Sequence, residues 1–276
     1  MQTKNNKIGI GLITCDRLDF FKKSFSSLQN VIDNSENYEF IVINDGKDET
    51  HTVPTNYIKT NGKEGVAKAK NYALRFLMEK ECEHIFLMED DIEIIDADVF
   101  NFYINASNKT GIKHFNYALH GNHNLNHLNQ PNVLKTINYP NTDVSIDIYP
   151  NVLGAFSYYH IDVLKDVGIM DENFYNAMEH VDHTYQIIKK GYNPPFRYFV
   201  DVNGSNKYLK DIVPDHKQSK IRSESDFQQV FKKGVDTFIE KNNFSVIQGY
   251  GPAEKVVKQD EAIKSLREIW KKYHQE

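Results

Sequence analysis

The sequence contains few cysteines and no long apolar run. Only two of its 276 residues are cysteines, Cys15 and Cys82. Two thiols are too few for a disulfide framework, so we expect both to be reduced core residues in a reducing compartment. No window approaches the about 18 consecutive apolar residues that a membrane-spanning helix needs, and residues 1–14 lead into a short strand rather than a signal peptide. These absences predict a soluble protein of the cytoplasm.

An excess of basic residues is also lacking. The chain has 33 Lys and Arg against 38 Asp and Glu, and its formal net charge is -5. Because such a chain has no bulk attraction to nucleic acid or to anionic lipid, we expect no nucleic-acid partner, and an anionic substrate must be bound by local groups. The hydrophobic content of 40% is enough for a substantial core, so a disordered chain is excluded.

Apolar runs and helical periodicities alternate along the first part of the chain. Runs at 8–13, 40–43 and 85–88 predict buried strands, and the spacing of apolar residues predicts helices that begin near Asp16 and near Glu64. Parallel strands need crossover connections, which helices usually supply. The order of these elements therefore predicts an α/β fold with a doubly wound sheet.

The pattern changes after residue 111 to short strands and long polar loops. An acid-bearing helix is predicted from Glu179 to Lys190, followed by Gly191 as a helix stop. From Asp226 onward, two apolar stripes at helical spacing predict a helical appendage that packs on the preceding domain or on another subunit. The stripes contain Phe227, Val230, Phe231, Phe238 and Ile239, and then Val256, Ile263, Leu266, Trp270 and Tyr273.

Three acidic residues, Glu89, Asp90 and Asp91, directly follow the predicted strand 85–88. Ligands in open α/β sheets bind at the carboxyl ends of strands, so we expect this trio at the mouth of a cleft. Adjacent carboxylates repel one another unless a hard cation such as Mg²⁺ or Mn²⁺ lies between them, and these ions commonly hold phosphates. The trio predicts a metal with a diphosphate, although a solvated charge run remains the alternative.

A second group of polar residues lies in the segment AMEHVDHTYQ. Glu179, Asp182 and His183 are spaced at i, i+3 and i+4, so they project from neighbouring faces of one helical turn. A carboxylate at such a place can remove a proton from a hydroxyl group. The alternative is an exposed amphipathic helix. Three histidines of an Asn-rich loop, at positions 120, 123 and 127, favour a polar loop over a zinc site, because no cysteine and no helical register accompany them.

Four segments, in this order, resemble the inverting nucleotide-sugar glycosyltransferases of the A fold, the large family that includes chondroitin, hyaluronan and cellulose polymerases and many bacterial surface-polysaccharide enzymes. They are GLITCDRLDFFKKSFSSL, VINDGKDET, GKEGVAKAKNYAL with FLMEDDIEI, and GIMDENFYNAMEHVDHTYQIIKKGY. The resemblance implies a mixed, doubly wound sheet of the glycosyltransferase A type. It implies a catalytic domain at 1–222, with a nucleotide half of about 1–110 and an acceptor half of about 111–222, and a helical appendage at 223–276.

The resemblance also assigns the metal site. In that family, an Asp-X-Asp motif at the strand end binds the divalent cation and the sugar, which makes Asp91 the metal ligand and Glu89 or Asp90 the group that faces the ribose or the donor sugar. The Glu in the first position departs from the motif. His216 falls where many members place a histidine that ligates the metal or the diphosphate.

Further matches concern the nucleotide. Thr14 and Arg17 fall where the first strand opens onto it, and Asp45 falls at the uracil, although Asn44 and Lys47 depart from the family's turn. Lys70 matches an arginine near the base and the phosphates. A solvated helix face is the alternative for Lys70. Gly154 and Ala155 match an acceptor-side strand in which small residues let the donor sugar approach the backbone, although both also suit a tightly packed strand.

The family's base belongs to a Glu-Asp-X-Asp motif, in which the second residue usually accepts the proton. This chain has His180 at that position, which is a clear departure. We therefore expect Glu179 to be the base, with Asp182 as the second candidate and His180 as an unorthodox third.

These observations predict a hexosyl- or N-acetylhexosaminyltransferase that uses Mn²⁺ or Mg²⁺. It would move a sugar, with inversion, from a UDP-sugar to a hydroxyl of a glycan, lipid-linked or polymer acceptor. We expect it in the cytoplasm or at the inner face of the membrane, with self-association through the C-terminal helices left open. Two alternatives remain. A nucleotidyltransferase of similar fold would need a Gly-rich basic loop after the first strand, which is lacking, and a non-catalytic carbohydrate-binding or scaffold module is favoured only by His180.

Overall fold

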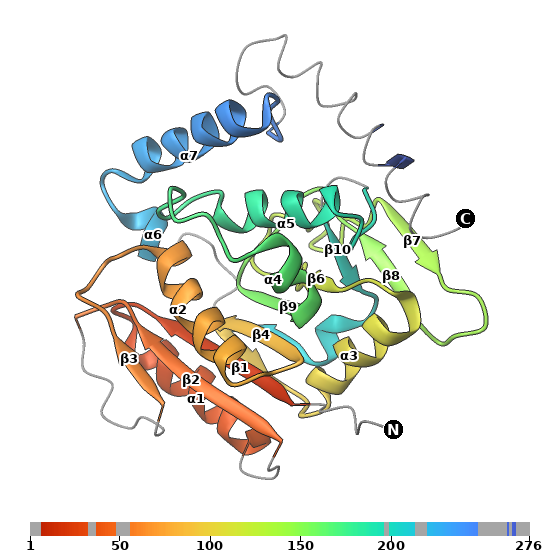
Figure 1. Ribbon diagram of the computed structural model, residues 1–276, viewed down its shortest axis with the longest axis horizontal. Coiled ribbons are helices and arrows are strands. Elements are labelled where there is room, and N and C mark those ends of the chain that lie inside the picture. The colour runs from red at the N-terminus through yellow and green to blue at the C-terminus, as the bar shows by residue number, and fades with distance from the viewer. Residues whose placement is uncertain are drawn as a thin grey trace.

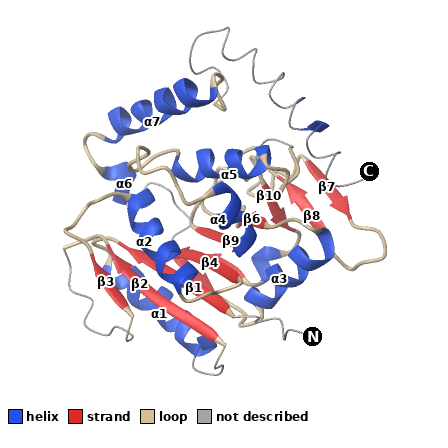
Figure 2. Ribbon diagram, in the orientation of Figure 1, coloured by secondary structure: helices blue, strands red, loops and turns tan. Residues whose placement is uncertain are grey.

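A central six-stranded sheet organises the computed structural model, which describes residues 7–32, 37–47, 56–195, 199–212 and 220–247 and residues 264, 267 and 268 (Figures 1 and 2). Its strand order is β3-β2-β1-β4-β9-β6. The first four of these strands run parallel, whereas β9 runs antiparallel to both β4 and β6. The predicted mixed α/β sheet is therefore confirmed. The strands are β1 (Ile8–Thr14), β2 (Tyr38–Asn44), β3 (Tyr57–Lys59), β4 (His84–Glu89), β6 (His114–Asn116) and β9 (Phe156–His160).

Two small antiparallel sheets accompany the central one. The order of the first is β10-β8-β7, and the second pairs β11 with β5. Because β5 follows the acidic trio directly, its pairing with β11 brings the chain near residue 211 to the carboxyl end of β4. The strands are β5 (Ile92–Ile94), β7 (Lys135–Asn138), β8 (Ser145–Ile148), β10 (Val200–Val202) and β11 (Leu209–Asp211), and a short 3₁₀ helix, η1 (Ser205–Lys207), precedes β11.

Helices cover both faces of the central sheet, as a doubly wound fold requires. Helices α1 (Leu18–Ile32) and α3 (Val99–Thr110) pack against one face. Helices α2 (Val66–Glu79), α4 (Ile161–Val167) and α5 (Glu179–Lys189) pack against the other. No helix in the described ranges is long and apolar enough to cross a membrane.

The sequence of β1 explains how α2 comes so close to the sheet. Ile10 and Leu12 point to the α1 face, and Gly9 and Gly11 alternate with them toward α2. A Cβ placed on Gly11 would lie 2.6 Å from the Cβ of Ala73 in α2. The missing side chains therefore let α2 lie directly on β1.

Gly11→Ala is expected to lower the free energy of unfolding by about 1–3 kcal/mol, the usual cost of overpacking a core. Urea denaturation would measure the loss. The double variant Gly11→Ala with Ala73→Gly also removes the opposing methyl group, so it should recover part of the lost stability. The recovery is reduced by the cost of a glycine inside a helix, about 1 kcal/mol. Equal stability of Gly11→Ala and the wild-type chain would contradict the close contact.

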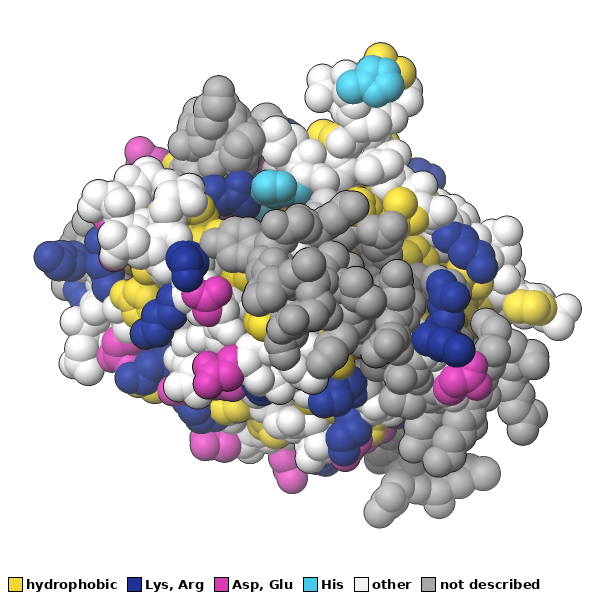
Figure 3. Space-filling view, turned by 90° about the horizontal axis from the view of Figure 1, so that it is seen from above, with side chains coloured by type: hydrophobic (Ala, Val, Ile, Leu, Met, Phe, Trp, Pro, Cys, Tyr) yellow, Lys and Arg dark blue, Asp and Glu magenta, His cyan; other side chains and the backbone are white. Residues whose placement is uncertain are grey.

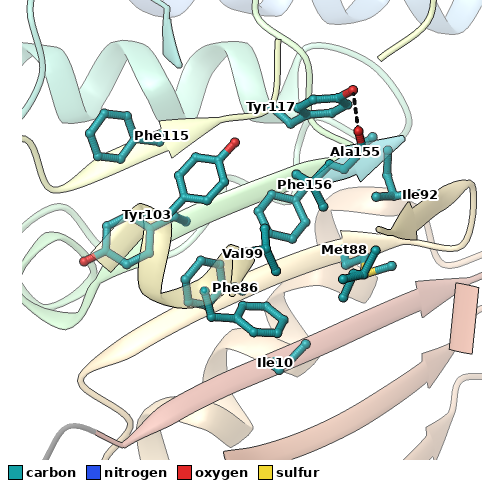
Figure 4. Packing of buried hydrophobic residues seen from close by; sticks show 14 of the residues in the cluster. Ile10, Phe86, Met88, Ile92, Val99, Tyr103, Phe115, Tyr117, Ala155 and Phe156 are labelled. Carbon is teal, nitrogen blue, oxygen red and sulfur yellow. Dashed lines mark hydrogen bonds between the residues drawn. The ribbon is translucent and has the colours of Figure 1, made fainter. Parts of the chain in front are cut away.

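Aromatic side chains join the two predicted halves of the domain into one core (Figure 4). Phe86 of β4 and Tyr103 of α3 both pack against Phe156 of β9, with ring centroids 5.8 and 5.5 Å apart. Tyr103 also contacts Phe115 of β6, at 6.0 Å. Because such rings contribute much of the buried apolar area, this packing joins residues on both sides of position 110 in one core.

The C-terminal part of the described chain contains α6 (Lys220–Ser223) and α7 (Phe227–Asn242), and α7 packs on α5. Phe238 of α7 lies 5.7 Å from the ring of Tyr185 in α5. Gly234 approaches the loop before α5 so closely that a Cβ would lie 2.8 Å from the carbonyl oxygen of Ala177. The first predicted stripe thus forms a helix, whereas the second, at 256–273, lies outside the described residues.

Candidate active site

The polar residues at the carboxyl ends of β1, β2 and β4 surround one cavity. The parallel register places Ile13 beside Glu89 and Thr14 beside Asn44, so the three strands end at the same edge of the sheet. The cavity has a volume of about 210 Å³ and is called the first cavity below. Its lining includes six residues predicted from the sequence: Thr14, Arg17, Asp45, Glu89, Asp90 and Asp91.

Arg17 binds two of the three carboxylates. Its guanidinium group donates to Asp90 Oδ1 and, at 2.9 Å, to Asp91 Oδ2, while Thr14 Oγ1 donates to Asp90 Oδ2 at 2.6 Å. Asp90 is 0% exposed. Burial raises the pKa of Asp90 to about 7, although the Arg17 charge opposes the rise. Hydrogen bonds and ion pairs therefore hold Asp90 and Asp91 in a largely buried arrangement, and the alternative of a solvated charge run is wrong for Asp90.

Asp91 retains one oxygen without a protein partner. Its Oδ1 is buried, and no described residue donates a hydrogen bond to it. A buried carboxylate oxygen in this state is costly unless a ligand satisfies it. Within the described ranges, no three His, Cys, Asp or Glu side chains are arranged to hold a metal ion together, and His216 lies outside these ranges. Asp91 Oδ1 is thus the atom with free capacity for a cation.

Asp45 organises the loop that enters α2. Its carboxylate accepts hydrogen bonds from Thr60 Oγ1 at 2.5 Å, from the backbone N–H of Glu64 at 2.8 Å and from that of Gly65 at 2.9 Å. Asp45 is only 5% exposed. Its side chain therefore holds residues 60–65 against the end of β2 while it forms part of the first cavity.

Lys70 is a buried bridge between two parts of the site. Its ammonium group lies 2.7 Å from Glu89 Oε1 and 3.7 Å from Glu179 Oε1, and it donates to the carbonyl oxygen of Gly154 at 2.9 Å. Burial alone would lower the pKa of Lys70, but the two carboxylates raise it above its ordinary value. Lys70 is 1% exposed, so the alternative of a solvated helix face is wrong.

Glu179, the first residue of α5, faces a second cavity of about 410 Å³, which Glu89 and His120 also line. The Glu179 side chain is buried, and its Oε1 lies 2.8 Å from His180 Nδ1. Burial raises the pKa of a carboxyl group, but His180 and Lys70 outweigh it and lower the pKa of Glu179 to about 2. Glu179 is therefore ionised at neutral pH and able to accept a proton.

Gly154 makes room for protein groups. A Cβ on this residue would lie 2.9 Å from His180 Cγ and 3.0 Å from Lys70 Nζ. In the structure, Gly154 thus lets His180 and Lys70 approach the backbone, which agrees with the alternative of a tightly packed strand.

Asp182 lies in a different environment from Glu179. Its Oδ2 is 2.8 Å from Lys241 Nζ, and its Oδ1 accepts from Gln186 and from Asn242, each at 3.1 Å. It lines neither cavity. Asp182 therefore joins α5 to α7, and the tertiary structure separates the two carboxylates that the sequence places on one helical turn.

His120 is a residue of the site that sequence reasoning missed. Its Nδ1 lies 2.9 Å from Asp211 Oδ1, and its ring lines both cavities. Burial lowers the pKa of a histidine, but the carboxylates of Asp91 and Asp211 outweigh it and raise the pKa of His120 to about 9. His120 is therefore a cation between the two cavities. Its partner is 91 residues away, so no local signal in the Asn-rich loop could have identified it.

The C-terminal helices also line the site, which the sequence did not predict. Phe227 borders both cavities, Val230 borders the first and Phe231 borders the second. A salt bridge of 3.0 Å joins Glu224 to Lys63, and both residues line the first cavity. The appendage therefore contributes walls to the site in addition to its packing on α5.

No family model matches the sequence. The chain is 25% identical over 226 residues to an uncharacterized glycosyltransferase, R363, of Acanthamoeba polyphaga mimivirus, an alignment that spans 75% of this chain and 82% of that protein. The fold of this chain is similar to that of residues 1–349 of S. aureus TarS. The TM-score is 0.53 and the identity 14%, and the superposition covers 98% of this chain and 73% of that one. The fold is that of an A-type glycosyltransferase.

Two solved complexes share this fold. The UDP-GlcNAc complex of S. aureus TarS 1–349 superposes with a TM-score of 0.51 and 14% identity over 98% of this chain and 92% of that one. A mannosyltransferase from Pyrobaculum calidifontis, PcManGT, in complex with GDP-Man and Mn²⁺, superposes with a TM-score of 0.50 and 11% identity over 95% of this chain and 73% of that one. The predicted resemblance to A-fold glycosyltransferases is confirmed.

Proposed function

We propose that this protein is a metal-dependent glycosyltransferase that moves a sugar from a UDP-sugar to an acceptor hydroxyl with inversion. One observation carries the proposal: Glu179, ionised and buried, lies on the second cavity within 3.7 Å of Lys70, which in turn binds Glu89 on the first cavity. A buried carboxylate beside an acidic, strand-end site, in a fold that other proteins use with nucleotide sugars, supports the proposal that Glu179 accepts the proton.

The donor is assigned to the first cavity. Its polar lining at the carboxyl ends of parallel strands is the usual ligand position of such sheets. UDP and UDP-GlcNAc occur in solved complexes of TarS, which supports a UDP-sugar. Asp45 would face the base, and Thr14 and Arg17 hold the acidic strand end in place.

Asp91 would hold Mn²⁺ or Mg²⁺ through its unsatisfied Oδ1, with His216 as the proposed second ligand. Ile212 of the described chain donates its backbone N–H to the carbonyl oxygen of Asp91 at 2.8 Å. When bound, the cation would neutralise the negative charge of the departing diphosphate.

Side chains of the protein account for the transfer of the acceptor hydroxyl's proton. Glu179 takes the proton of the acceptor hydroxyl as that oxygen forms a bond to the anomeric carbon. The bond from this carbon to the diphosphate breaks, and its electron pair leaves with the diphosphate. Attack from the side opposite the leaving group inverts the anomeric configuration. His180 orients Glu179, and Lys70 keeps it ionised by raising the cost of its protonation.

Asp91→Asn is expected to abolish turnover and to weaken metal-dependent UDP binding while the fold stays intact, because the amide cannot replace a charged ligand. Thermal shift with UDP, with and without Mn²⁺, measures binding to the native state, and release of UDP from UDP-sugars measures turnover. The matched control is Asp96→Asn, an exposed carboxylate seven residues from the trio's first member. Full turnover in the presence of a chelator would contradict the metal requirement.

A further inference from the structure

Six residues line both cavities and therefore mark the place where the cavities meet, called the junction below. Three of them are apolar and three are polar. They are Val66, Glu89, His120, Asn176, Ile221 and Phe227. The polar three come from the end of β4, the loop after β6 and the loop before α5, so segments far apart in the sequence supply them.

His120 is held in the junction by one ring nitrogen and presents the other. Its Nδ1 lies 2.9 Å from Asp211 Oδ1, and the second oxygen of Asp211 accepts the backbone N–H of Gly121. No described residue forms a hydrogen bond with His120 Nε2, and this atom is not buried. The Nε2 atom is therefore available to a ligand, and Asp211 fixes its direction.

Asn176 and Glu89 follow the same pattern. Asn176 Oδ1 accepts the backbone N–H of Val66 at 3.0 Å, and Glu89 Oε1 lies 2.7 Å from Lys70 Nζ. The other polar atom of each side chain, Nδ2 or Oε2, has no hydrogen-bond partner in the described chain and is not buried. Three side chains are thus oriented in advance, each with one polar atom left for a ligand, which lowers the entropic cost of binding.

On the proposed function, the transferred sugar lies at this junction. It is bonded to the diphosphate, which is assigned to the first cavity, and its anomeric carbon is attacked by the hydroxyl that Glu179 binds on the second cavity. Thr14 and Asp45 line only the first cavity, so they lie toward the nucleotide. The residues shared by both cavities are the ones that a group bonded on both sides would contact.

We infer that His120 and Asn176 bind hydroxyl groups of the transferred sugar, beside Glu89, and thereby select the sugar that this protein accepts. The inference rests on the proposed function. A hydroxyl group both donates and accepts, so it can pair with the amide N–H of Asn176, with the carboxylate of Glu89 and with the imidazole of His120 in either protonation state. The C–H groups of the sugar ring would pack against Val66 and Phe227.

Contacts inside the site have to supply this selection. Basic and acidic side chains lie interspersed over the described part of the face that carries α7 (Figure 3), and the charge of a surface attracts all UDP-sugars of the same charge alike. A sugar that lacks one hydroxyl, in contrast, leaves a polar group of the junction without its partner, which is costly.

The test compares donors that differ by a single hydroxyl. The full-length protein with Mn²⁺ is assayed for UDP release from UDP-glucose, UDP-galactose and UDP-N-acetylglucosamine, with water as the acceptor, and the preferred donor is then compared with its monodeoxy analogues. For the wild-type protein, kcat/KM is expected to fall by about tenfold or more when a hydroxyl bound at the junction is missing. Because all these donors share UDP, effects on the metal or the nucleotide cancel in the ratio of parent to analogue.

Two variants remove the available atoms and keep the bonds that orient them. His120→Asn retains a nitrogen for Asp211 but has no counterpart of Nε2, and Asn176→Asp retains an oxygen for the backbone N–H that it binds but loses the donor. Each is expected to bring the ratio for one hydroxyl to within about threefold. The matched controls are His127→Asn, in the loop of His120, and Asn105→Asp, in α3. Both positions are exposed and line neither cavity, so every ratio should stay unchanged.

The outcomes separate the inference from the function on which it rests. Unchanged ratios in both variants, with UDP release intact, would overturn the inference and leave the proposed function standing. The same holds for a wild-type protein that uses the parent donor and every monodeoxy analogue equally well. If none of the three UDP-sugars is consumed or bound, with or without Mn²⁺, the proposed function itself fails and the inference fails with it.

Discussion

Glu179→Gln is expected to lower the rate of sugar transfer by about 10²-fold or more, with little change in UDP binding. The amide keeps the size of the side chain and its hydrogen-bonding capacity but cannot accept the proton of the acceptor hydroxyl. Steady-state rates of UDP release, together with UDP binding followed by thermal shift, measure the two effects separately. A variant with nearly normal kcat would show that Glu179 is not the base.

Asp182→Asn is the matched control, because it lies one helical turn from Glu179 and changes charge in the same way. Its carboxylate binds Lys241 at 2.8 Å and lines neither cavity. We expect kcat to change by less than about threefold, while the melting temperature falls as the contact between α5 and α7 weakens. The reverse pattern, a severe loss in Asp182→Asn with near-normal Glu179→Gln, would exchange the two assignments.

Lys70→Met is expected to damage both stability and catalysis. Removing one partner of a buried ion pair typically costs about 3–5 kcal/mol, because the other charge is left uncompensated, and here Glu89 and Glu179 would both lose the same cation. Chemical denaturation would measure the loss of stability. Turnover should fall by at least about tenfold in protein that remains folded at the assay temperature.

The pH profile distinguishes an electrostatic role of Lys70 from a purely structural one. In the wild-type protein, His180 and Lys70 lower the pKa of Glu179 to about 2, so protonation of Glu179 should not limit kcat/KM at neutral or mildly acidic pH. Without Lys70, the carboxyl group is buried with less positive charge, its pKa rises, and the acidic limb of the profile should move to higher pH.

Two controls accompany this experiment. Lys70→Arg keeps the charge and should restore most of the wild-type pH profile even if packing suffers. Lys68→Met removes a lysine of the same helix that is 40% exposed and pairs with Glu64, so it should lower the stability far less than Lys70→Met does. An unchanged acidic limb in Lys70→Met would show that the lysine does not influence the ionisation of Glu179.

The sequence predicts well which residues surround the first cavity, because their placement depends on local patterns. Each of Thr14, Asp45 and Glu89 lies at or directly after the end of an apolar run, and the ends of neighbouring parallel strands necessarily meet at one edge of a sheet. Only the strand order has to be correct for these residues to come together. The register between β1 and its two neighbours confirms that order.

The acceptor side was predicted less completely. Helical spacing places Glu179 and Asp182 on neighbouring faces, but it cannot say which face meets the cavity and which meets α7. His120 was assigned to a polar loop because its partner, Asp211, belongs to a strand far along the chain. The apolar stripe of α7 was recognised, yet its role in the second cavity depends on where the helix packs.

The sequence by itself therefore determined the class of fold, the strand ends that carry the acidic trio and the stripes of the helices, since each is encoded in residues a few positions apart. Only the tertiary structure decided that Lys70 bridges Glu89 and Glu179, that His120 lines both cavities and that α7 contributes to the lining of both. These features depend on contacts between residues that are distant in the sequence: Lys70 and Glu89 are 19 positions apart, and the other pairs are farther apart. Such contacts are set by how helices and strands pack, which the periodicity of any one segment does not contain.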